Sequence, residues 1–172
     1  GEVQHHGHFA FLISEAPGQP DVYLRGRTLR LAMNGDRVQA RVTGAQGGRR
    51  LGEIVRVVSR ARTSMVGVLR RVGKFWAVIA EGGDEADGLQ VLGLAKGVKP
   101  VEGHLVDLKI DRWPTEDRAA GGTVTEVLGS PSDPKTRVRA LLAERELPTV
   151  FPDDALAQAD ALPREVEPGV WE

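Results

Sequence analysis

The sequence predicts an all-β protein made of two small five-stranded barrels in tandem, followed by two short helices. Two observations carry this prediction. Short segments in which apolar and polar residues alternate recur along residues 1–129, separated by turns rich in glycine and proline. Five such segments fill residues 1–60 and five more fill residues 63–129, so the pattern restarts after about 65 residues.

The five strands of the first predicted barrel lie at residues 1–6, 8–13, 21–25, 36–43 and 51–58. A brief helical stretch is expected near Thr28 to Ala32. The run Asn34-Gly35-Asp36 is a strong turn signal, because Asn and Gly accept positive φ angles. Short strands divided by turns of this kind are typical of a small closed barrel.

The five strands of the second predicted barrel lie at residues 64–71, 74–81, 88–93, 103–113 and 121–129. Gly103-His104 occupies the place that Gly35-Asp36 has in the first barrel, directly before a strand of alternating apolar residues. Only residues 59–63 remain to link the two barrels. We therefore expect the barrels to be in contact.

Residues 130–172 form a predicted helical extension and a linker to a domain that is missing from the chain. Asp133 suits the N-cap of a helix and Pro134 its first position, and the helix is expected over 135–147, where Pro148 stops it. A second start follows at Phe151-Pro152, with an acidic helix over 153–162. The remaining residues, 163–172, look like a linker.

The composition of the 172 residues is that of an ordinary globular protein, with 41% hydrophobic and 27% charged residues. The absence of cysteine excludes disulfides and thiolate metal sites. No apolar run approaches the roughly 20 residues that cross a bilayer, and no signal-peptide pattern opens the chain. We expect a cytoplasmic protein without a membrane partner. Because the first residue already begins a strand, we also expect the chain to be cut from a longer one.

Charge is divided unevenly along the chain. Residues 1–74 hold 13 Lys and Arg against 5 Asp and Glu, whereas residues 75–172 hold 10 against 19. A basic N-terminal half favours the binding of a polyanion. The alternative is a general bias toward arginine in which the charges are simply solvated.

Two phenylalanines, Phe9 and Phe11, share one face of the second strand, while Tyr23 and Arg25 share one face of the third. The residues between them are apolar and supply a separate inward face (Ala10, Leu12, Val22 and Leu24). We therefore predict that the three rings point outward, the alternative being that they belong to the core. Outward rings stack on bases, and basic side chains beside them hold phosphates.

The predicted nucleic-acid-binding residues extend beyond these rings. His5 is expected on the same face of the first strand, and arginines line the edge. In the second barrel Phe75 and Ala77 share one face, with Trp76 and Val78 on the other, so one ring must point inward. The full set is His5, His8, Phe9, Phe11, Tyr23, Arg25, Arg27, Arg37, Lys74 and Phe75.

At these residues the chain resembles the cold-shock domain, which has the OB fold and carries motifs like K-G-F-G-F-I and V-F-V-H. The runs HFAFL and VYLR stand in those places, with His8 and Ala10 where the family has glycines and His5 where it usually has a tryptophan. The order of the whole chain resembles the N-terminal half of bacterial ribonuclease R, of the ribonuclease II family. That order is two barrels with Gly35-Asp36, then Arg112-Trp113-Pro114, Glu126 to Gly129, a helix, Leu147-Pro148 and Phe151-Pro152.

The resemblance implies a cytoplasmic enzyme that degrades RNA processively from the 3′ end, with magnesium at a cluster of aspartates in its catalytic domain. It implies that this chain binds single-stranded RNA and guides it to that domain. The chain has no Asp-x-Asp-Asp run, so we expect no catalytic or metal site in it. Asp84, Asp87, Asp153 and Asp154 are interpreted as a loop and a helix start. The alternatives are a free-standing RNA chaperone and a protein-interaction module.

Overall fold

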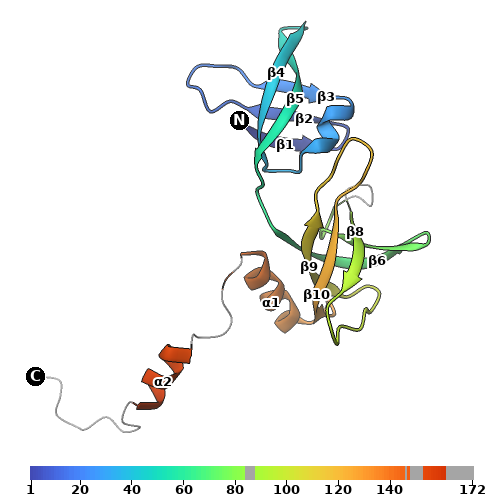
Figure 1. The fold of residues 1–172 in the computed structure, drawn as a ribbon, viewed down its shortest axis with the longest axis vertical. Helices are drawn as coiled ribbons and strands as arrows, with labels where there is room; N and C mark the ends of the chain where they lie inside the picture. Colours follow the sequence, from blue (N-terminus) through green and yellow to red (C-terminus); the bar gives the residue numbers. More distant parts are fainter. Residues whose placement is uncertain (84–87, 146, 148–152, 162–172) are drawn as a thin grey trace, which may run out of the picture.

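The computed structural model describes residues 1–83, 88–145, 147 and 153–161 (Figure 1). It consists of two closed five-stranded barrels joined end to end, with one helix packed on the second barrel and another helix further along the chain. The predicted fold class is therefore confirmed. The positions 84, 87, 148, 151 and 152 and the segment 163–172, on which parts of the sequence-based interpretation rest, lie outside the described residues.

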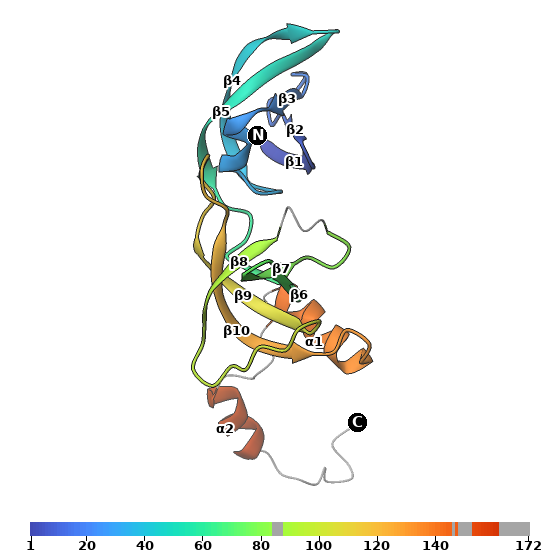
Figure 2. The same ribbon diagram turned by 90° about the vertical axis from the view of Figure 1, so that its right-hand side faces the viewer.

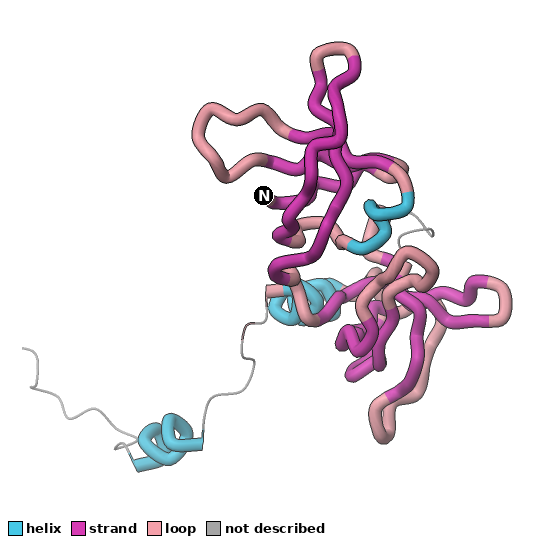
Figure 3. Tube along the Cα trace, turned by 45° about the horizontal axis from the view of Figure 1, so that its top comes forward, coloured by secondary structure: helices cyan, strands magenta, loops and turns pink. Residues whose placement is uncertain are grey.

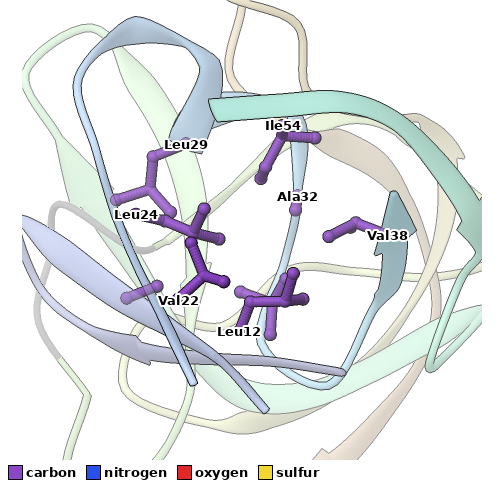
Figure 4. Close-up of a cluster of buried hydrophobic side chains, with 9 residues drawn as sticks. Leu12, Val22, Leu24, Leu29, Ala32, Val38 and Ile54 are labelled. Carbon is purple, nitrogen blue, oxygen red and sulfur yellow. The ribbon is translucent and has the colours of Figure 1, made fainter. Parts of the chain in front are cut away.

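The first barrel contains the strands β1 (Glu2–His6), β2 (Phe9–Ile13), β3 (Val22–Arg25), β4 (Arg37–Gln46) and β5 (Arg49–Ser59), closed in the order β1-β2-β3-β5-β4. Only the β3–β5 pair is parallel. A 3-10 helix, η1 (Arg27–Leu31), stands between β3 and β4 on the side that faces the second barrel (Figure 3). The inward side chains meet in one core, formed by Val3, Ala10, Leu12, Val22, Leu24, Leu29, Ala32, Val38 and Ile54 (Figure 4).

The second barrel repeats this arrangement. Its strands are β6 (Ser64–Val72), β7 (Phe75–Ile79), β8 (Leu89–Leu94), β9 (Leu105–Arg112) and β10 (Gly121–Gly129), closed in the order β10-β8-β7-β6-β9, and its single parallel pair is β10–β8. Nine buried residues form its core: Met65, Leu69, Val78, Leu89, Val106, Leu108, Ile110, Ala120 and Val124. The predicted domain boundaries, which divide the chain into residues 1–60, 63–129 and 130–172, remain a prediction.

The predicted turns before β4 and β9 form in the same way. Gly35 adopts a φ of 85°, and its N–H donates to the carbonyl of Val3 at 2.8 Å. Gly103 adopts a φ of 81°, and its N–H donates to the carbonyl of Leu69, also at 2.8 Å. The alignment of Gly35-Asp36 with Gly103-His104 is thus confirmed by two equivalent backbone contacts.

The hairpin of β4 and β5 is longer than the sequence pattern predicted. We expected strands ending at residue 43 and starting at 51, whereas the pairing continues to Gln46 and Arg49 around the turn Gly47-Gly48. Figure 2 shows this two-stranded ribbon projecting beyond the barrel. Its outer part is exposed on both faces, so the alternation of apolar and polar residues that marks a half-buried strand is absent there.

Helix α1 (Pro134–Glu144) begins as predicted, because the Asp133 side chain accepts a hydrogen bond from the backbone N–H of Lys135. Its Ala140 packs with Val66, Leu105 and Leu128 on the outside of the second barrel. The helix ends at Glu144, three residues before the predicted limit. Helix α2 covers Asp153–Ala161.

Candidate nucleic-acid interface

Four rings form a cluster on the outer face of the first barrel. Phe9 stacks on Tyr23 with ring centroids 5.3 Å apart and planes 23° from parallel, and Phe11 meets both rings edge-on. His6 stacks on the other side of Phe9, also at 5.3 Å, with the planes 16° apart. All four come from the neighbouring strands β1, β2 and β3. We call them the ring face.

The register of the sheet explains why these side chains gather. Phe11 lies directly across from Tyr23 in the β2–β3 pair, and the next outward pair is Phe9 with Arg25. The residues between them are buried in the core, including Ala10 and Leu24. Since successive side chains of a strand point to opposite faces, the rings must face away from the core. The predicted outward orientation of the three rings is confirmed.

The predicted place of His5 is wrong. His5 pairs with the buried Ala10 and so lies on the inward side of β1, where its ring nitrogen Nε2 is 3.0 Å from the carbonyl oxygen of Ala32. His6 occupies the outer position instead, because the two-residue turn Gly7-His8 places it directly across from Phe9. The tight turn was the missed signal, since it fixes the register of a hairpin.

The basic residues predicted beside the rings fall into two groups. Arg25 lies across from Phe9, is exposed and has no acidic partner within the described part of the chain. Arg37, in contrast, donates two hydrogen bonds to the carboxylate of Glu15, at 2.8 and 2.6 Å. Arg27 pairs with Asp117 at 2.8 Å. Of these three arginines, Arg25 is the one whose charge is left for a phosphate.

The pair of Arg37 and Glu15 gives a pH prediction. The hydrogen bonds from the Arg37 guanidinium hold the pKa of the Glu15 carboxyl below its ordinary value. A lowered pKa in the folded state means that this pair stabilises the protein at neutral pH and that the stabilisation is lost as the pH falls through the folded pKa. In Arg37→Gln, Glu15 should titrate at a higher pH than in the native protein, as followed by carboxyl NMR. An unchanged titration would show that the pair does not persist in solution.

The second barrel offers a different surface at the equivalent positions. Its β6–β7 hairpin pairs Val72 with Phe75 where the first barrel pairs His6 with Phe9. Its β7–β8 pair sets Ala77 across from Gln90 where the first barrel has Phe11 and Tyr23. Phe75 is 61% exposed, whereas Trp76 packs against the core, so one of the two neighbouring rings does point inward. Lys74 stands at the turn beside Phe75. This face therefore carries one ring in place of four.

Comparison with known proteins gives two matches to family models, one in each half of the chain. Residues 1–57 match the family model "Ribonuclease B OB domain", and residues 93–152 match the model "Cold shock domain". Ribonuclease R of Aquifex aeolicus is 29% identical over 165 residues, which are 95% of this chain and 23% of that protein. Ribonuclease R of Acidithiobacillus ferrooxidans is 32% identical over 152 residues, 87% of this chain and 34% of that protein.

The chain is homologous to the N-terminal region of ribonuclease R. It spans about a quarter to a third of the length of these two relatives. The solved structure of Mycoplasma genitalium RNase R in complex with ribose methylated single-stranded RNA shares the fold, with a TM-score of 0.70 at 16% identity. That similarity covers 96% of this chain, and so both barrels, and 27% of the other.

Among the residues that the structure describes, no group of three or more His, Asp or Glu side chains is placed to hold a metal ion. Nor is any described helix long and apolar enough to cross a membrane.

A hollow of about 730 Å³ between β6, β7 and the start of α1 is lined by charges of both signs, among them Arg70, Glu81 and Arg137. It is not part of the ring face.

Proposed function

We propose that this chain is the single-stranded RNA-binding region of a cytoplasmic 3′-5′ exoribonuclease, and that it captures RNA and guides it to a catalytic domain of the same enzyme. The ring face carries the proposal. Exposed aromatic rings on an OB barrel stack on successive bases and tolerate any sequence, since every base has a flat face. The homology to ribonuclease R supports the nuclease context, and magnesium would belong to the catalytic domain.

The proposed roles follow from where each side chain lies. Phe9, Phe11 and Tyr23 stack on bases, His6 extends the stack, and Arg25 binds a phosphate. A second, weaker contact is formed by the residues at the tip of the β6–β7 hairpin, Lys74 and Phe75, and His8 borders the ring face at its turn. Arg27 and Arg37 have smaller roles, because acidic partners already neutralise them.

The proposal is tested by measuring the affinity for a fluorescent single-stranded oligoribonucleotide across a salt series, beside a blunt duplex. We expect binding of the single strand that weakens steeply with salt, because each neutralised phosphate releases counterions, with a slope of about −0.7 per phosphate. The duplex should bind more weakly, since its bases are not free to stack. Absence of binding at low salt would overturn the proposal in favour of a protein-interaction module. Tight binding by a protein that has no catalytic domain in the same polypeptide would favour an RNA chaperone.

The two neighbouring histidines provide an internal comparison. His6→Ala should weaken single-strand binding about fivefold or more, because it removes the outermost ring of the stack. His5→Ala should leave the affinity within about twofold, because His5 faces inward. Equal losses in the two variants, measured by fluorescence anisotropy, would contradict the assignment of His6 to the interface.

A further inference from the structure

The short link between the barrels is held by a buried carboxylate. Asp36 is 1% exposed, and its two oxygens accept three hydrogen bonds. The donors are the backbone N–H of Met33 at 2.8 Å, the backbone N–H of Ala61 at 2.9 Å and the Arg60 guanidinium at 2.8 Å. Two of these donors belong to the linker itself. The linker is therefore fastened to the first barrel by the turn that precedes β4.

The same arginine reaches the second barrel. The Arg60 guanidinium lies over the ring of Trp113, 4.7 Å from its centroid, while it also donates to the carbonyl of Leu31 at 3.0 Å. Trp113 packs against the second core, as does Met33 from the first barrel. A guanidinium that bonds to one barrel and stacks on the other joins them through a single rigid plane.

A second tie lies nearer to solvent. Arg27 of η1 pairs with Asp117 at 2.8 Å and with Glu116 at 3.6 Å, and both acids lie in the β9–β10 loop. Arg30 donates to the backbone carbonyl of Glu116 at 3.4 Å. These groups are exposed, so salt weakens this tie more than the buried one.

The second barrel shows that the turn itself does not require the carboxylate. There His104 stands in the place of Asp36, and its backbone makes the equivalent contact, accepting from the N–H of Leu69 at 2.9 Å as Asp36 accepts from Val3 at 2.9 Å. The backbone of the turn thus forms with either residue. The side chain of Asp36 serves a further purpose, which is to hold the linker.

We propose that Asp36, Arg60 and Trp113 are positioning residues that fix the orientation of the two barrels, so that the chain binds RNA as one rigid unit. The RNA part of this inference rests on the proposed function. A strand that leaves the ring face then meets the Lys74–Phe75 tip at a set place, and the second contact benefits from a high effective concentration. We call Asp36, Arg60 and Trp113 the clamp. Its loss should weaken only the binding of RNA long enough to reach both barrels.

The orientation is tested with spin labels, which the cysteine-free sequence makes simple. Labels at Val42→Cys and Leu94→Cys occupy exposed strand positions, one in each barrel. Pulsed dipolar spectroscopy should give one narrow distance distribution for the native background. Arg60→Met and Trp113→Leu should widen it at least about twofold, whereas Arg62→Met, an exposed linker arginine, should not. Native-like distributions in both clamp variants would overturn the inference.

The consequence for RNA is tested with unlabelled protein and two oligoribonucleotides. One has about 4 nucleotides, the lower limit of the site size of one barrel, and the other has about 16, so that it can extend beyond a site of that size. Arg60→Met should leave the affinity for the short one within about twofold and lower that for the long one about fivefold or more. Equal losses for both lengths would overturn the inference, since they indicate general damage. Failure of the native protein to bind either length would instead refute the proposed function. The distances between the spin labels would still test whether the two barrels have a fixed orientation.

Discussion

Replacement of Phe9, Phe11 and Tyr23 together by alanine is expected to lower the affinity for single-stranded RNA about 100-fold or more. Each base stacked on an aromatic ring contributes about 1–3 kcal/mol, and three lost rings therefore remove at least about 3 kcal/mol. The rings lie on the outer face of β2 and β3 and are only partly buried, so the core beneath them stays intact. Fluorescence anisotropy with an oligoribonucleotide measures the loss.

The matched control retains three rings at the same positions. Phe9→Tyr, Phe11→Tyr and Tyr23→Phe combined should bind within about threefold of the native affinity, because stacking depends on the flat ring. Both triple variants should keep the native far-ultraviolet circular dichroism and melt cooperatively. Native affinity in the alanine variant would refute the ring face as the site of RNA binding.

The elements that the sequence predicted well are those with one buried face. Phe9, Ala10, Phe11 and Leu12 alternate between solvent and core, and that period of two is read directly from residue types. The outer part of the β4–β5 ribbon has no buried face, so its length left no such signal. The outward orientation of the three aromatic rings was predictable for the same reason, because the apolar residues between them already account for the inward face of each strand.

Register was the part that residue types alone did not settle. His5 and His6 are chemically identical, and only the pairing across the Gly7-His8 turn decides which of them stands beside Phe9. A shift by one residue moves every side chain of a strand to the other face. The partners of Arg27 and Arg37 were likewise beyond prediction, since Asp117 and Glu15 come near them only in the folded chain.

Removal of the Asp36 carboxylate is expected to have a large effect on the stability of the protein. Asp36→Ala should lower the free energy of unfolding by about 3 kcal/mol, because it leaves the Arg60 charge and two backbone N–H groups without their acceptor. The estimate lies at the lower end for a broken buried pair, since Arg60 is 22% exposed and water can reach it. Urea unfolding followed by far-ultraviolet circular dichroism measures the change.

The exposed pair of Glu15 and Arg37 is the control for this experiment. Both of its side chains are more than half exposed, so Glu15→Ala should shift the urea midpoint little, although the hydrogen bonds are as short as those of Asp36. The contrast separates burial from hydrogen-bond length as the source of stability. The urea midpoint of Asp36→Asn should lie between those of Asp36→Ala and Glu15→Ala. The amide oxygen of Asn still accepts from a backbone N–H, whereas the negative charge opposite Arg60 is lost. Equal midpoints for Asp36→Ala and Glu15→Ala would mean that the linker carboxylate contributes no more than a surface charge, and the clamp would then lose its energetic basis.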